Sequence, residues 1–211
     1  NKSEDNKNSQ YGVLQVMRIN NDFSKFDKAV LTEIRDIVKD AVKNYYTQIA
    51  ADTDFLTNAA NRKVFMERLD IEKNRGEKYG TKYSMMIFDL DHFKKFNDDY
   101  GHDQGDYVLT EVVKIVTDEL DKTYTFARIG GEEFALLMPD TGREKAYEIA
   151  ETLKNRISAH EFKSLKDNSN IQVTTSVGVA SWDETDGKEH NIMKVADENL
   201  YLAKQERSCV R

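Results

Sequence analysis

The chain has 211 residues, of which 33% are charged, and a formal net charge of −7. This length suits one domain plus an appendage, and the acidic balance disfavours a protein that wraps nucleic acid by neutralising its phosphates. A single cysteine, Cys209, excludes a disulfide framework or zinc cluster and points to a reducing compartment, the cytoplasm. No apolar run reaches membrane-spanning length, so we expect no membrane contact from this chain.

The N-terminal part is predicted to be an appendage. Residues 1–21 read as a polar tail followed by a short strand, YGVLQVMRI. Apolar residues from Phe26 to Ile49 then follow helical spacing, which predicts a long connecting helix within residues 22–51. Its apolar stripe indicates either packing on a core or pairing with a second copy in a coiled coil, because a and d positions are not kept strictly.

Residues 52–211 are predicted to form an α/β domain. Helices are expected over residues 62–78, 92–99, 105–120, 143–160 and 189–206, and strands over residues 82–90, 123–129, 132–138 and 171–181. Helices and strands alternate, but a hairpin interrupts the alternation. The pattern therefore predicts a mixed central β-sheet flanked by helices.

Acidic residues gather where two of these strands end. In RIGGEEFALLMP (128–139) the glycines predict a tight turn with positive φ, but Glu132 and Glu133 repel each other and add nothing to packing. Asp89 ends an apolar strand, and a buried carboxylate needs a cation or hydrogen-bond donors. If that strand lies beside the hairpin, Asp89 meets the two glutamates. Three carboxylates around one point favour a divalent metal next to a triphosphate.

Several residues near these acids also fit purely structural roles, such as helix capping or core packing. We expect Asp91 to cap the next helix at its N-terminus, and Phe93 and Phe96 to pack in the core. On local grounds Asp106 also reads as an N-cap and Asn97 as a C-cap.

Several segments together resemble the motifs of the GGDEF family of diguanylate cyclases, here in a GGEEF form. They are DFLTNAANRKVF (54–65), FDLDHFKKFND (88–98), YGHDQGDYVL (100–109), RIGGEEF (128–134), VTTSVGVA (173–180) and ADENLYLAK (196–204). The family's order and spacing are kept across residues 52–207, so the resemblance implies a GGDEF domain with a nucleotidyl-cyclase, palm-like fold.

The resemblance also implies an activity and its residues. Such an enzyme condenses two GTP into cyclic di-GMP, releases two pyrophosphates and acts as a symmetric dimer. The catalytic acids would be Asp89, Glu132 and Glu133, and two Mg²⁺ (or Mn²⁺) ions would be held by these acids and the Leu90 carbonyl. Guanine would be bound by Asn97 and Asp106, in a pocket shaped by His102. Phosphates would be bound at the helix start by Phe93 and Lys94, and also by Lys204 and Arg207.

Two departures from the family pattern carry expectations of their own. The product-inhibition motif R-x-x-D is replaced by DKTY, with Asp121 and Tyr124 at its charged positions, so the primary inhibitory site is expected to be absent. Ser208 stands where the family has a phosphate-binding arginine, and Arg207 is one position earlier.

The N-terminal segment 11–46 has a separate resemblance, to the last strand and exit helix of a GAF sensory domain. This implies that the chain is the output part of a longer sensor protein. Two other functions stay open: a receptor that only binds nucleotide, which would not need the acids, and an enzyme making a mixed cyclic dinucleotide, which would not keep Asp106.

Overall fold

The computed structural model describes residues 24–118, 120–182 and 191–211. The predicted tail and strand in residues 1–21 lie outside this described part. The chain divides into two compact units, residues 1–47 and 48–211, and each is described by itself. Within the described residues, no helix combines the length and hydropathy that crossing a bilayer requires.

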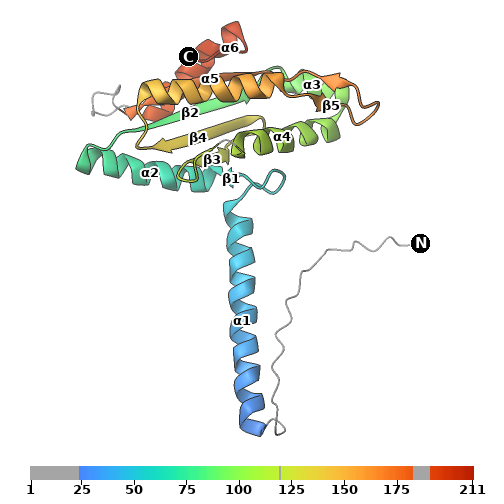
Figure 1. The fold of residues 1–211 in the computed structure, drawn as a ribbon, viewed down its shortest axis with the longest axis vertical. Helices are drawn as coiled ribbons and strands as arrows, with labels where there is room; N and C mark the ends of the chain where they lie inside the picture. The colour runs from blue at the N-terminus through green and yellow to red at the C-terminus, as the bar shows by residue number, and fades with distance from the viewer. Residues whose placement is uncertain (1–23, 119, 183–190) are drawn as a thin grey trace. The chain divides into compact units, whose positions relative to one another are not determined.

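The connecting helix is present as α1 (Lys25–Asp52), drawn in blue in Figure 1. It begins with a capping box, in which the Asp27 amide donates to Ser24 Oγ and the Ser24 amide donates to Asp27 Oδ2. None of its 28 residues is buried. Its exposed apolar side chains are Phe26, Val30, Ile34, Ile37, Val38, Val42, Tyr45, Tyr46 and Ile49.

The second unit is built on a five-stranded mixed sheet with the order β1-β3-β4-β2-β7 (Figure 1). The strands are β1 (Ala60–Asn61), β2 (Tyr83–Leu90), β3 (Thr125–Arg128), β4 (Glu133–Pro139) and β7 (Thr175–Ser181). β1 pairs with β3 in parallel, and the other neighbours are antiparallel. The predicted mixed α/β fold is confirmed, and all eight residues of β2, which lies between β4 and β7, are buried.

Helices cover both faces of this sheet. They are α2 (Arg62–Tyr79), α3 (Phe93–Tyr100), α4 (His102–Thr117), α5 (Arg143–Ala159) and α6 (Ile192–Glu206). Side chains alternate along β2, so Met86 and Phe88 pack with the apolar sides of α4 and α5, while Met85 and Ile87 pack with those of α2 and α6. The domain therefore has three layers, with helices on both sides of the sheet. The C-terminal end of β2 and the N-terminal end of β4 lie at the same edge of the sheet.

The predicted strand over residues 171–181 is divided. Its first part is β6 (Asn170–Ile171), which pairs with β5 (Phe162–Lys163) in a separate two-stranded sheet, and only β7 joins the main sheet. Helix α6 begins at Ile192 after the Asn191 cap, three residues later than predicted.

Gly178 in β7 allows α6 to approach the sheet closely. A Cβ atom there would lie 2.1 Å from the Ala196 carbonyl oxygen and 2.2 Å from the Leu200 amide nitrogen. Both contacts are backbone atoms, so a clash cannot be relieved by a side-chain rotation.

We therefore expect Gly178→Ala to lower the free energy of unfolding by about 3 kcal/mol or more, measured by urea denaturation. Gly131→Ala is the control, because a Cβ atom at Gly131 meets no heavy atom within 4 Å. Equal unfolding midpoints for the two variants would contradict this account of how β7 and α6 pack.

Candidate active site

Asp89 and the acids after the Gly-Gly turn come together, as the predicted strand pairing requires. β2 and β4 are antiparallel neighbours, with Asp89 opposite Glu133. Beyond the last pair, the Leu90 amide donates to the Glu132 carbonyl oxygen at 3.3 Å. The two strand ends thus place Asp89, Leu90, Glu132 and Glu133 at one edge of the sheet.

The Gly-Gly turn forms for a different reason from the one predicted. Positive φ was expected at these glycines, but in the described chain only Gly80 and Gly101 have it among glycines. At Gly130 the turn is close to a side chain instead, because a Cβ atom there would lie 2.6 Å from Glu133 Oε2 and would displace that carboxylate. The amides of Ile129 and Gly130 both donate to the Glu133 carbonyl oxygen, which fixes the turn.

Asp89 is paired with a lysine from the other end of the chain. Lys204 Nζ, in the last turn of α6, lies 2.8 Å from Asp89 Oδ2. Burial raises the pKa of Asp89, and Lys204 only partly offsets this rise. The predicted need of this buried carboxylate for a cation or donor is therefore met by Lys204, the residue for which the sequence implied phosphate binding.

Glu132 is electrostatically coupled to this pair. Its pKa is raised by partial burial and by the negative charges of Asp89 and Glu133, while Lys204 acts in the opposite direction. In the described residues, no three His, Cys, Asp or Glu side chains converge closely enough to hold a metal ion. The acids are adjacent, but Lys204 occupies one carboxylate oxygen of Asp89.

Asp91 does not cap α3, so that prediction is wrong. The N-cap position is His92, which has φ 57° and donates or accepts no capping side-chain hydrogen bond. The Asp91 carboxylate instead accepts from Thr174 Oγ1 at 2.8 Å and Ser176 Oγ at 2.7 Å. Arg207 Nη1, expected at the phosphates, lies 3.3 Å from Asp91 Oδ1.

The start of α3 is open to an anion. Phe93 is buried in the core and its ring stacks on Phe96, as predicted, whereas Lys94 is exposed in the first turn. No side chain caps this helix, so the amides of its first turn receive no capping hydrogen bond from a side chain. Free amides and a lysine at a helix N-terminus favour a phosphate group.

The two residues implied for guanine binding belong to neighbouring helices. Neither is a cap: Asn97 lies within α3, and Asp106 is exposed in the second turn of α4, after His102 at its start. Asn97 Oδ1 is buried without a hydrogen-bond partner. A Cβ atom at Gly105 would lie 2.0 Å from that oxygen, so any other residue there would displace the Asn97 side chain.

Two supporting side chains were missed in the sequence. Gln104, which is 3% exposed, donates to the Lys163 carbonyl and accepts from the Leu165 amide, and so fastens the β5–β6 segment to α4. Arg128 donates to Asp54 Oδ1 at 2.9 Å and to the Gly131 carbonyl at 2.7 Å. Arg128 therefore links the turn after α1 to the Gly-Gly turn. Its position just before the two glycines is the sequence feature that could have indicated this role.

At the expected position of an inhibitory site, both side chains have local partners. The Asp121 carboxylate accepts from the amide and hydroxyl of Thr123, and these bonds lower the pKa of Asp121. Tyr124 Oη lies 3.1 Å from Thr141 Oγ1.

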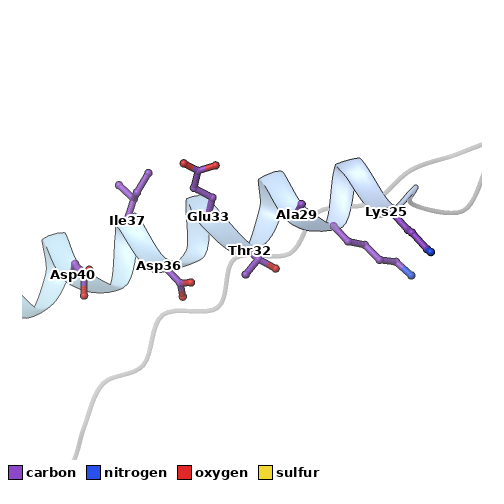
Figure 2. A pocket seen from close by; sticks show the side chains of 8 residues that line it. Lys25, Ala29, Thr32, Glu33, Asp36, Ile37 and Asp40 are labelled. Carbon is purple, nitrogen blue, oxygen red and sulfur yellow. The ribbon is translucent and has the colours of Figure 1, made fainter.

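A hollow along α1 is not a candidate site. Figure 2 shows its lining side chains, which all come from this one helix and carry both signs of charge. Glu33 and Ile37 point to one side of the helix and Asp36 points to the other (Figure 2). One helix surrounds a ligand on too few sides to bury it.

With this geometry established, comparison with known proteins identifies the family. Residues 51–209 match the family described as "Diguanylate cyclase, GGDEF domain". The chain belongs to the GGDEF family. Diguanylate cyclase A of Treponema denticola is 33% identical to this GGDEF protein over 206 residues, which cover 94% of the chain and 55% of that relative. Response regulator PleD of Caulobacter vibrioides is 36% identical over 154 residues, which cover 73% and 34%.

Solved structures of GGDEF proteins share the fold. The coiled coil and GGDEF domain of DgcB from Caulobacter crescentus, in complex with c-di-GMP, has a TM-score of 0.81 at 29% identity and covers 89% of this chain and 98% of that one. The DgcB GGDEF domain with c-di-GMP has a TM-score of 0.71 at 35% identity, covering 76% and 92%. The GGDEF chain described here spans about half, or less, of the length of the curated relatives above.

Proposed function

We propose that the protein is a diguanylate cyclase, which condenses two GTP into cyclic di-GMP and releases two pyrophosphates. The observation that carries this proposal is the meeting of Asp89, Glu132 and Lys204 at one edge of the sheet. Family membership supports it, as do relatives named as diguanylate cyclases. The residue roles below are part of the proposal.

Asp89, Glu132, Glu133 and the Leu90 carbonyl would hold two Mg²⁺ or Mn²⁺ ions. Oxygen donors suit such hard cations, and the raised pKa values of Asp89 and Glu132 show carboxylates whose charge lacks full compensation. Bound metal would lower the pKa of a ribose hydroxyl and neutralise charge on the phosphates. The donor set therefore fits the metal in chemical type, with two conditions: Lys204 must leave Asp89, and the carboxylates must move closer together than they lie in the described structure.

Asn97 and Asp106 would bind guanine, with His102 shaping the pocket. A carboxylate at Asp106 can accept from both guanine N1–H and the exocyclic amine, a pair of donors that adenine does not offer. The unpartnered Asn97 Oδ1 supports a ligand role, because an unpaired buried acceptor costs about 1–3 kcal/mol.

Phosphates would lie at the uncapped start of α3, near the Phe93 amide and Lys94. Lys204 would move from Asp89 to the phosphates, exchanging one anionic partner for another. Arg207 would contribute only if it left Asp91, so we assign it the weakest part in phosphate binding.

In the reaction, the 3′ oxygen of one GTP forms a bond to the α-phosphorus of the other. The bond from that phosphorus to the bridging oxygen breaks, and pyrophosphate leaves with the electron pair. Glu132 is proposed to take the proton of the 3′-hydroxyl. A second, equivalent step closes the ring.

We further propose the organisation of the whole protein. Residues 22–51 would be the connecting helix and residues 52–211 the catalytic domain, which acts as a homodimer behind a GAF-like sensor. The DKTY segment leads us to expect only weak product inhibition, at the active site itself. A cytoplasmic location rests on the single cysteine alone.

The direct test offers the purified chain GTP or ATP with Mg²⁺ and identifies products by mass. We expect cyclic di-GMP from GTP, and a kcat/KM for ATP lower by about 10³-fold or more, because buried polar groups stay unpaired with adenine. Binding of GTP without product would favour the receptor alternative, and a mixed cyclic dinucleotide from both substrates together would contradict the assigned guanine pocket.

A further inference from the structure

The Asp91 carboxylate joins β7 to the segment that follows α6. Its side chain is 1% exposed. Besides Thr174 and Ser176 on the β7 side, it accepts from Arg207 Nη1 at 3.3 Å and from the Ser208 amide at 3.1 Å. Four donors from two distant parts of the chain therefore converge on one carboxylate, which is more than a helix cap would need.

Residues 207–211 run beside β7 and continue the sheet. Val177 and Val210 form a parallel bridge. The Val177 amide donates to the Cys209 carbonyl at 2.9 Å, and the Arg211 amide donates back to the Val177 carbonyl at 2.9 Å. The bonds to Asp91 lie at the turn that leads into this segment.

The backbone of that turn is strained, so contacts with other residues must stabilise it. Arg207 has φ 65° and Ser208 has φ 47°, a region that side chains disfavour. A residue in this region is energetically disfavoured and persists only where its surroundings determine it. The surroundings here are the Asp91 carboxylate, which receives one donor from each of the two residues.

The turn directly follows the lysine of the site. α6 ends at Glu206, and Lys204 in its last turn reaches Asp89 at 2.8 Å. Both acids of the sequence Asp89-Leu90-Asp91 thus contact the same end of α6, one through Lys204 and the other through the turn. We propose that Asp91 is a positioning residue that fixes this end of α6, so that Lys204 is delivered to Asp89 and, when GTP is bound, to its phosphates. This inference rests on the proposed function.

The test measures nucleotide binding instead of turnover. GTP with a methylene group between its α- and β-phosphates cannot release pyrophosphate, so its affinity can be measured with Mg²⁺ by calorimetry. Guanosine, measured by competition, reports the base pocket alone. We expect Asp91→Ala to weaken the analogue about tenfold, the worth of one charge-assisted hydrogen bond, and to change guanosine affinity less than twofold.

Two comparisons separate positioning from general damage. Lys204→Ala should give the same loss as Asp91→Ala, and the double variant should lose no more than either, because Asp91 acts through Lys204. Asp91→Asn, which keeps acceptor oxygen, should recover part of the affinity. Asp70→Ala removes an exposed acid from α2 and should change neither ligand's affinity.

Ser208→Pro tests the same turn from the other side, should Asp91→Ala fail to fold. Proline removes the amide that donates to Asp91 and also excludes the positive φ of the turn, while Ser208→Gly keeps that amide and suits the positive φ. We expect weaker analogue binding for the proline variant only.

Unchanged analogue affinity in Asp91→Ala, equal losses of guanosine and analogue, or multiplied losses in the double variant would each overturn the proposal. If the wild-type chain binds the analogue but makes no cyclic di-GMP, the proposed reaction fails while the role of Asp91 stands on the binding results.

Discussion

Glu132→Gln is expected to reduce the turnover of GTP by roughly a thousandfold or more, because it removes both a proposed metal ligand and the proposed proton acceptor. Glutamine has nearly the same size, so packing at the strand end should be kept. The pKa of Glu132 is raised by partial burial and by Asp89, which means that its charge is a cost to the folded state. The variant should therefore be no less stable than the wild type. Initial rates and urea unfolding measure the two effects.

Glu67→Gln is the matched control, since it makes the same change at an exposed position of α2. It should keep wild-type turnover. Asp89→Asn should behave like Glu132→Gln in both measurements, because it removes a proposed metal ligand and because the pKa of Asp89 is also raised in the folded state, so that losing its charge should not lower stability. Turnover within tenfold of wild type in both site variants would remove the metal assignment.

The meeting of Asp89 with the acids of the hairpin could be predicted from the sequence, because two acids at the ends of apolar strands need only the strands to pair. Periodicity also predicted β2, β3, β4 and β7 of the main sheet and the five helices around it, but not the two-residue strand β1. The division of residues 171–181 into β6 and β7 could not be predicted, since the segment carries no turn residue that separates the two strands and only tertiary pairing distinguishes them.

The partners of the buried acids Asp89 and Asp91 could not be predicted for another reason, which is their distance along the chain. Asp91 looked like a local cap, but its donors Thr174, Ser176, Arg207 and Ser208 are 83–117 residues away along the chain. Lys204 on its own reads as a solvated helix residue, although its ammonium reaches Asp89. Such pairs follow from how α6 packs on β7, and that packing depends on the room at Gly178.

A strong dependence of specific activity on enzyme concentration is the second large effect that we expect. In the described part of one chain we propose a single guanine pocket, around Asn97 and Asp106, beside a single group of acids, around Asp89 and Glu132. The reaction needs two GTP, each with its 3′-hydroxyl facing the other's α-phosphate. Under the proposed function, we therefore expect two chains to meet face to face with two-fold symmetry, each supplying half of the site.

α1 is the element proposed to bring the two chains together. All of its residues are accessible in the single chain, including an apolar stripe through Ile34, Val38 and Tyr45. The stripe does not keep strict heptads, so it should pair only weakly by itself. The DgcB structure with the higher TM-score is described as a coiled coil and GGDEF domain, which supports this use of the helix.

We therefore expect the dilute protein to be monomeric and its specific activity to rise with concentration until dimers dominate. Below that point, a tenfold dilution should lower specific activity up to about tenfold, as mass action on a dimer requires. Val38→Glu should shift the rise to higher concentration, whereas Lys43→Gln, an equal change of charge away from the stripe, should not. A parallel coiled coil fused in register before Phe26 should restore activity at low concentration. Initial rates measured alongside sedimentation decide the matter: constant specific activity from a species that sediments as a monomer would exclude a site made of two halves.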